Sequence, residues 1–86
     1  MLDKGFEAWI MLPGTETVSG ASGQELSLIP LTEYARVTSR GLYYELNNLI
    51  LHQNSARGIS NVFQQDQAQL EVHEGTLLVV KLSKYS

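Results

Sequence analysis

Arginine and tyrosine side chains are concentrated in one central stretch of this sequence, beginning at Tyr34. If the stretch is helical, Arg36, Arg40 and Tyr44 fall four residues apart and share one face. Both residue types are enriched where proteins bind one another tightly, and the same pairing can stack on bases while holding phosphates. The sequence therefore predicts a binding surface made of Arg36, Arg40, Tyr43 and Tyr44.

A purely structural role for these residues is the alternative. The tyrosines would then be half-buried, and the aliphatic stems of the arginines would lie over them. Gly41 interrupts the stretch and could separate its two halves. Both interpretations remain open from the sequence.

Groups able to do acid–base or metal chemistry are few. Glu71, His73 and Glu74 form one local cluster, and on a strand Glu71 and His73 would share a face. Two ligands do not hold a metal tightly, so a solvated turn is the simpler interpretation. No Gly-x-Ser-x-Gly elbow is present, and the glycines of residues 14–23 do not match a dinucleotide or P-loop pattern. We therefore assign no catalytic residue, metal or cofactor, and expect that the protein is not an enzyme.

Length and composition limit the remaining possibilities. The chain has 86 residues, 43% of them hydrophobic and 17% charged, which is typical of one folded domain spanning 1–86. A net charge of −3 gives no general attraction to nucleic acid. There is no cysteine, no apolar run near the ~18 residues of a membrane span, and no basic-then-apolar start typical of a signal peptide. These features predict a cytoplasmic protein.

The central stretch could be positioned by a helix. Pro30 precedes an acidic first turn, and Leu42, Leu46, Leu49 and Ile50 follow helical spacing, so the pattern favours a broken helix over about 31–53. A β-hairpin turning at Asn47-Asn48 is the alternative, because asparagine tolerates positive φ and the flanking residues suit strands.

The rest of the chain is typical of strands. Residues 6–12 read as a strand buried on both faces, with Trp9 in the core, and are followed by a flexible Gly/Ser/Thr loop over about 13–23 that could hold a weak strand at 15–19. Leu26–Ile29 and Ile59–Phe63 form short strands. At the C-terminus, 70–72 and 76–82 are expected to form a hairpin closed by Gly75, and the second run should be a central strand.

These elements predict an α+β fold, a small antiparallel sheet with a helix packed on one face; a small all-β barrel is the alternative. A domain this small gains stability readily by self-association, so we expect a homodimer. The function expected is a protein-binding module acting as an adaptor, inhibitor or regulatory subunit through contacts with itself or another protein. A nucleic-acid-binding regulator is second, and a small enzyme is third.

Overall fold

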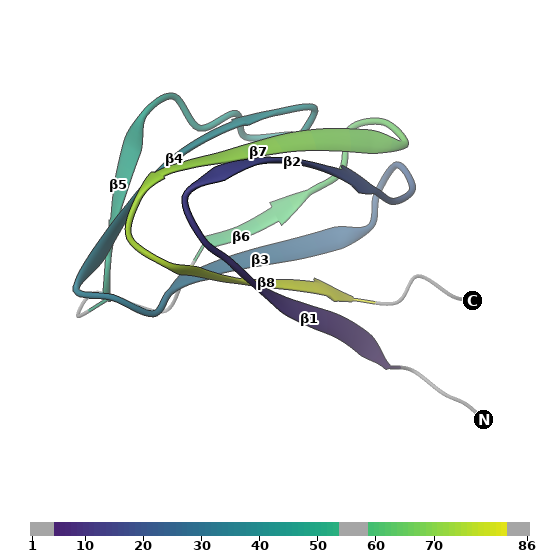
Figure 1. Cartoon of the computed structure of the whole chain (residues 1–86). Coiled ribbons are helices and arrows are strands. Elements are labelled where there is room, and N and C mark those ends of the chain that lie inside the picture. Colours follow the sequence, from purple (N-terminus) through teal and green to yellow (C-terminus); the bar gives the residue numbers. More distant parts are fainter. Residues whose placement is uncertain (1–4, 54–58, 83–86) are drawn as a thin grey trace.

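The protein is a sandwich of two four-stranded antiparallel sheets that face one another (Figure 1). The computed structural model describes residues 5–53 and 59–82, and within them there is no helix. Sheet A has the strand order β1-β8-β3-β6, and sheet B has the order β2-β7-β4-β5. The strands are β1 (Phe6–Met11), β2 (Gly14–Ser19), β3 (Glu25–Pro30), β4 (Tyr34–Arg40), β5 (Leu49–His52), β6 (Ile59–Val62), β7 (Gln67–Glu74) and β8 (Leu77–Leu82).

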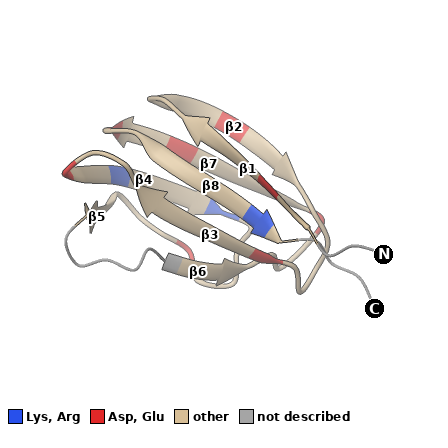
Figure 2. Ribbon diagram, turned by 90° about the horizontal axis from the view of Figure 1, so that it is seen from below, with Lys and Arg blue, Asp and Glu red and all other residues tan. Residues whose placement is uncertain are grey.

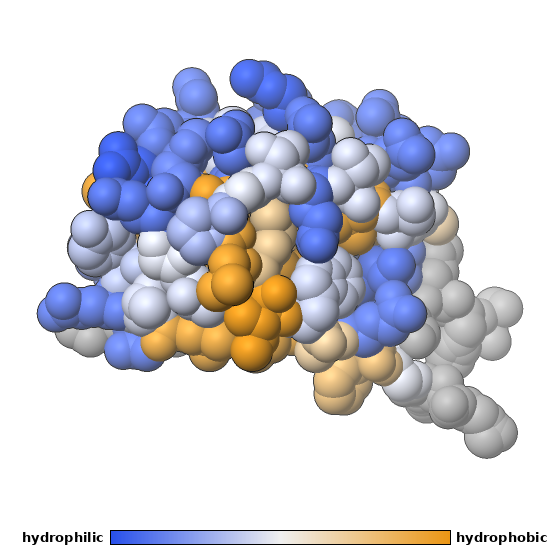
Figure 3. Space-filling model, in the orientation of Figure 1, coloured by the Kyte–Doolittle hydropathy of each residue, from blue (hydrophilic) through white to orange (hydrophobic). Residues whose placement is uncertain are grey.

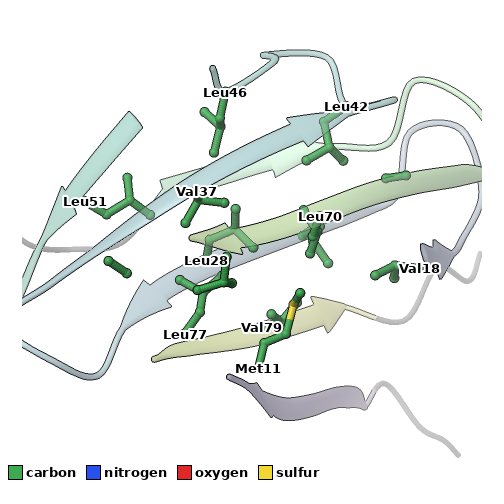
Figure 4. Packing of buried hydrophobic residues seen from close by; sticks show 14 of the residues in the cluster. Met11, Val18, Leu28, Val37, Leu42, Leu46, Leu51, Leu70, Leu77 and Val79 are labelled. Atoms are coloured by element: carbon green, nitrogen blue, oxygen red, sulfur yellow. The ribbon is translucent and has the colours of Figure 1, made fainter. Parts of the chain in front are cut away.

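The core lies between the two sheets and is built from alternate residues of their strands (Figure 4). Side chains in a strand point alternately to opposite faces, so each strand contributes every second residue to the interior. In β7, for example, Ala68, Leu70 and Val72 are buried while the residues between them are exposed. Sheet A contributes four fully buried side chains to the opposite side of the core: Leu26, Leu28, Leu77 and Val79.

The predicted helix over about 31–53 is wrong. Residues 34–40 form β4, which pairs with β7 on one side and with β5 on the other. The apolar spacing that suggested a helix has another cause: Leu42 and Leu46 are buried anchors of an irregular segment, and Leu51 points inward from β5. The alternative hairpin around Asn47-Asn48 does not form either, because β5 pairs with β4. The predicted α+β fold, with a helix packed on one face of the sheet, is therefore wrong. The described residues are all-β, as in the alternative, but their strands form two separate sheets rather than one barrel.

The expected C-terminal hairpin is also wrong, since β7 belongs to sheet B and β8 to sheet A. The chain crosses between the sheets at Gly75, which has a φ of 86°. A side chain there would overlap the carbonyl oxygen of Tyr34, so this crossing requires glycine. The prediction of a central strand is confirmed, because β8 lies between β1 and β3.

The N-terminal strand differs from its expected setting. β1 is an edge strand that pairs only with β8, and the outward face of β1 is exposed rather than buried. Trp9 lies partly buried against the core, and its Nε1 donates a hydrogen bond to Glu16 Oε1 at 2.9 Å. Within the stretch 13–23, the strand given as the alternative to a plain loop does form: residues 14–19 are β2 and pair with β7.

The strands expected at Leu26–Ile29 and Ile59–Phe63 are confirmed as β3 and β6, which pair with each other. Among the described residues, no helix is long and apolar enough to cross a membrane.

Candidate functional site

Residues 41–48, here called the bridging segment, carry the chain from β4 in sheet B past β6 in sheet A and back to β5. Gly41 makes the turn out of β4 with a φ of 91°. A Cβ at this position would lie 2.6 Å from the carbonyl oxygen of Gln67, so the turn requires glycine. Leu42 then bridges to Phe63, and the amide of Tyr43 donates a hydrogen bond to the carbonyl oxygen of Val62 at 2.8 Å.

Two leucines fix the bridging segment to the core. Leu42 is fully buried and Leu46 is nearly so. Leu46 also exchanges hydrogen bonds with Ser39: its amide donates to Ser39 Oγ at 2.9 Å, and its carbonyl accepts from the Ser39 amide at 2.8 Å. Between these anchors Tyr43, Tyr44 and Glu45 are exposed, the tyrosines by 61% and 62%. The segment therefore presents two aromatic side chains on a fixed backbone.

Asn61 of β6 holds the middle of the bridging segment. Its Oδ1 accepts the amide of Tyr44 at 3.0 Å, and its Nδ2 donates to the carbonyl of the same residue at 2.7 Å. The Oδ1 atom also accepts the amide of Val62 at 2.9 Å. Asn61 is 1% exposed, so these hydrogen bonds link the exposed Tyr44 to a buried side chain. Such a buried, fully paired amide stabilises one backbone conformation at Tyr44.

The two exposed rings are arranged edge to face, with centroids 4.8 Å apart and planes at 85°. This is a favourable aromatic geometry, and it leaves ring faces open to solvent. The face of a tyrosine attracts cations and stacks on planar rings. Glu45 follows directly in the chain and adds a negative charge. The bridging segment is thus suited to a flat, positively charged ligand.

Arg36 is engaged elsewhere, on the outer face of sheet B. Its Nη2 lies 2.6 Å from Glu74 Oε1, and the hydroxyl of Tyr34 donates to the same oxygen at 3.4 Å. The hydrogen bond and charge of Arg36 lower the pKa of Glu74, and the same contacts with Glu74 raise the pKa of Arg36. This guanidinium is therefore largely committed to an internal pair.

The outer face of sheet B also carries the cluster that the sequence singled out around His73. His73 Nε2 lies 2.8 Å from Thr38 Oγ1, and His73 Nδ1 lies 3.7 Å from Glu71 Oε2. Glu71 and His73 do share a face, as expected from a strand. No group of three or more His, Asp or Glu residues in the described ranges could hold a metal.

Arg40 lies near the opposite end of β4 and lines a shallow depression of about 310 Å³ with Thr17, Gly41, Gln67 and Gln69. Arg36 and Arg40 both belong to the outer face of sheet B, whereas Tyr43 and Tyr44 lie beyond Gly41, beside β6. The helical face that was expected to unite these four residues does not exist, and the structure divides them between two surfaces.

Two features of the site escaped sequence reasoning. Asn61 is a single asparagine within a short apolar strand, and a polar residue in such a run could have indicated a buried hydrogen-bonding role. Glu45 gave no signal of its own, since its importance depends on where Tyr43 and Tyr44 lie.

The sequence and the fold are both similar to those of known proteins. The family model of the thiamin pyrophosphokinase vitamin B1 binding domain matches residues 15–77. Thiamin pyrophosphokinase from Geobacillus thermodenitrificans superimposes with a TM-score of 0.86 at 30% identity, over 99% of this chain and 40% of its own. The Bacillus subtilis enzyme gives 0.82 at 23% identity, over 98% and 41% of the two chains. The Candida albicans enzyme gives 0.74 at 14% identity, over 92% and 31%. No curated protein matches the sequence.

These similarities overturn the functional expectations from sequence. The matched family and the similar structures are thiamin pyrophosphokinases, which are enzymes, so neither a regulatory adaptor nor a non-enzymatic assignment stands. The nucleic-acid-binding alternative falls for the same reason. The chain spans only about 40% of the length of the Geobacillus and Bacillus relatives, so it corresponds to one part of such an enzyme.

The family match covers most of the chain, and it includes strands β3 to β7, nearly all of β2 and the whole bridging segment. The Geobacillus structure agrees with it over nearly the full length at 30% identity. This sandwich therefore belongs to the family of thiamin pyrophosphokinase vitamin B1 binding domains.

Proposed function

We propose that this chain is the thiamin-binding part of a thiamin pyrophosphokinase, and that Tyr43 and Tyr44 of the bridging segment contact the thiamin. The family match supports thiamin as the ligand. The exposed tyrosine pair on a fixed backbone supports the bridging segment as its binding site. The pair is the single observation that carries the assignment of the site.

The chemistry of thiamin suits this surface. Its thiazolium ring has a permanent positive charge, and its aminopyrimidine ring is flat. Tyrosine faces attract such a cation by about 0.5–2 kcal/mol each, depending on how far water is excluded. Glu45, the residue after Tyr44, is also exposed and adds a negative charge to the segment.

The outer face of sheet B suits a cation less well. Arg40 places a positive charge beside its depression, and no described side chain pairs with that guanidinium. Arg36 pairs with Glu74, so this carboxylate is already engaged. We therefore assign Arg36 and Arg40 no direct role in holding the thiamin ring.

Transfer of the pyrophosphoryl group is proposed for the complete enzyme. Because this chain spans about 40% of the similar bacterial enzymes, we attribute the nucleotide and the transfer step to residues outside it. The cytoplasmic location predicted from sequence is part of this proposal.

Calorimetric titration of the 86-residue protein with thiamin tests the assignment. Changing Tyr43 and Tyr44 together to leucine should weaken binding by about tenfold or more, since two cation–π contacts are lost. Tyr34→Leu is the matched control, because this exposed tyrosine lies on sheet B, and it should bind as the parent does.

The neutral pyrimidine half of thiamin provides a second comparison. It should bind much more weakly than thiamin to the parent protein, because it lacks the thiazolium charge. Equal binding of thiamin by the parent and the double variant would refute the tyrosine site.

A further inference from the structure

The depression lined by Arg40 lies on the outer face of sheet B. Gln69 of β7 pairs with Arg40 of β4 on one side and with Thr17 of β2 on the other, so these residues form one row across three strands. They alternate with buried residues and therefore face outward. Hydrophilic colours cover the upper part of the molecule in Figure 3, where Figure 1 places β2 and β7.

The rim of the depression is held by the backbone. Gly41 lines the space of about 310 Å³ and has no side chain to fill it. The amide of Gln64 donates a hydrogen bond to the carbonyl oxygen of Gly41 at 3.0 Å, and the amide of Gly20 donates to the carbonyl oxygen of Asp66 at 2.9 Å. Gln65 lies between these two anchored residues, so its place at the rim is fixed before any ligand binds.

The side chains around the depression are mostly hydrogen-bond donors. The guanidinium of Arg40 offers five N–H groups, each glutamine amide offers two, and a threonine hydroxyl offers one. The lining residues that supply these groups are Arg40, Thr17, Gln65, Gln67 and Gln69. Within the described part of the chain, none of these side chains has a hydrogen-bond or ion-pair partner. None of the described lining residues is acidic. The depression therefore gathers unused donors around one positive charge.

The charge of Arg40 is set apart from the other charges of the structure. Acidic and basic positions are scattered over strands of both sheets (Figure 2), and the net charge is −3, so the molecule as a whole does not attract anions. Arg36 and Lys81 each pair with a glutamate, whereas Arg40 pairs with no described carboxylate. Glu71, the next outward residue of β7, lies 3.7 Å from His73 instead. An anion would thus be held by local contacts.

We propose that this depression binds the phosphate group of a small phosphate ester, with Arg40 as the charged contact and the glutamine amides and Thr17 as neutral donors. A phosphate presents oxygens in several directions, and here donors come from three strands and a turn. The guanidinium fork matches two of these oxygens at once. A carboxylate presents only two oxygens and would use part of the set. The volume lies at the lower end of small-molecule sites.

This phosphate site is separate from the thiamin site and does not rest on it. Tyr43 and Tyr44 lie beyond Gly41, beside β6, whereas Arg40 lies on the outer face of sheet B. A change at Arg40 should therefore weaken phosphate binding and leave the affinity for thiamin unaltered. Failure of one proposal would not imply failure of the other.

Titration of the isotopically labelled 86-residue protein at constant ionic strength tests the proposal. Glycerol phosphate should shift the resonances of Gly41 and of the side-chain amides of Gln67 and Gln69, with saturation at about millimolar concentration. Arg40→Gln should raise the dissociation constant at least about tenfold, because charge-assisted hydrogen bonds are lost. Arg36→Gln is the matched control: it removes the same charge from the same face, and it should bind as the parent does.

Gln69→Glu provides a second variant should Arg40→Gln fail to fold. It places a carboxylate in the centre of the row and should also abolish binding. The absence of a saturable shift in the parent would overturn the proposal, as would binding that survives both variants or that Arg36→Gln weakens equally. A site that took acetate as tightly as glycerol phosphate, or inorganic phosphate alone, would contradict the assignment to a phosphate ester. Loss of thiamin affinity in Arg40→Gln would show that the two sites are not separate.

Discussion

The outer faces of the two sheets differ although both sheets share one core. Sheet B presents threonine, glutamine and charged residues to water, including the Arg36–Glu74 and Thr38–His73 contacts. Sheet A presents isoleucine, leucine and valine in registered rows. Alternation of polar and apolar residues marks the first as a solvated face. The hydrophobic pattern of a strand thus tells how many of its faces are apolar, but not what covers them.

The largest loss of stability should come from a substitution at a core-facing residue of sheet A. Val79 is fully buried, so Val79→Asp places an unpaired carboxylate in the core. That costs several kcal/mol, as much as a domain this size has in total, and the variant should be unfolded at 25 °C by circular dichroism. Val80→Asp, one residue along and facing outward, should remain folded. Melting of the Val79 variant at the parent temperature would contradict the central-strand assignment.

A substitution at the crossing between the sheets should have the next largest effect. Gly75→Ala forces a positive φ on alanine, at about 1–3 kcal/mol, and its Cβ would also meet Thr32 Oγ1 at 2.7 Å. Chemical denaturation should show a lower midpoint with an unchanged slope. Gly5→Ala, where no atom lies within 4 Å of the added carbon, should leave the midpoint unaltered. Equal midpoints for the two variants would show that the crossing is not strained.

The bridging segment depends on one buried amide. Asn61→Ala removes both hydrogen bonds to the backbone of Tyr44 and should lower the free energy of unfolding by about 1–3 kcal/mol. It should also weaken thiamin binding, because the tyrosine rings lose their fixed position. Asn47→Ala, an exposed change in the same segment, should do neither. A stable Asn61 variant with parental affinity would remove the asparagine from the site.

Breaking the Arg36–Glu74 pair on sheet B should have only a small effect on stability, and this effect should depend on pH and salt. Arg36 lowers the pKa of Glu74, so the pair stabilises the protein above the unfolded-state pKa of this carboxyl and loses this contribution as the pH falls through the lower folded value. The stability difference between the parent and Glu74→Gln should therefore be largest near neutral pH and should shrink as the pH falls into the acidic range. Added salt should reduce it at neutral pH. A difference that is constant with pH would mean that the pair contributes nothing.

Much of sheet A could be predicted from sequence, and much of the central region could not. The apolar runs gave β3, β6 and the central position of β8, because strands apolar on both faces belong inside a sheet or under a partner. Two buried anchors, Leu42 and Leu46, reproduced helical spacing within a loop. The turn at Gly75 looked like a hairpin, since local sequence does not state whether consecutive strands pair or cross between sheets.

The candidate site was predicted in part for the wrong reason. Tyr43 and Tyr44 were chosen for a helical face shared with Arg36 and Arg40, and that face requires a helix the chain does not form. Their exposure depends instead on Asn61 and on the leucine anchors, which are contacts between residues distant in sequence. Contacts between residues distant in sequence leave no pattern in the local sequence, so they could not be predicted from it.

Thiamin binding at the bridging segment can be tested most directly by titrating the isotopically labelled 86-residue protein with thiamin and following its amide resonances. The largest shifts should fall on Tyr43, Tyr44 and Glu45, and on Asn61 behind them, while the outer face of sheet B around Arg36 and Arg40 stays unchanged. Shifts concentrated at Arg36 and Arg40, or no shift at Tyr43 and Tyr44 under saturating thiamin, would contradict the proposed site.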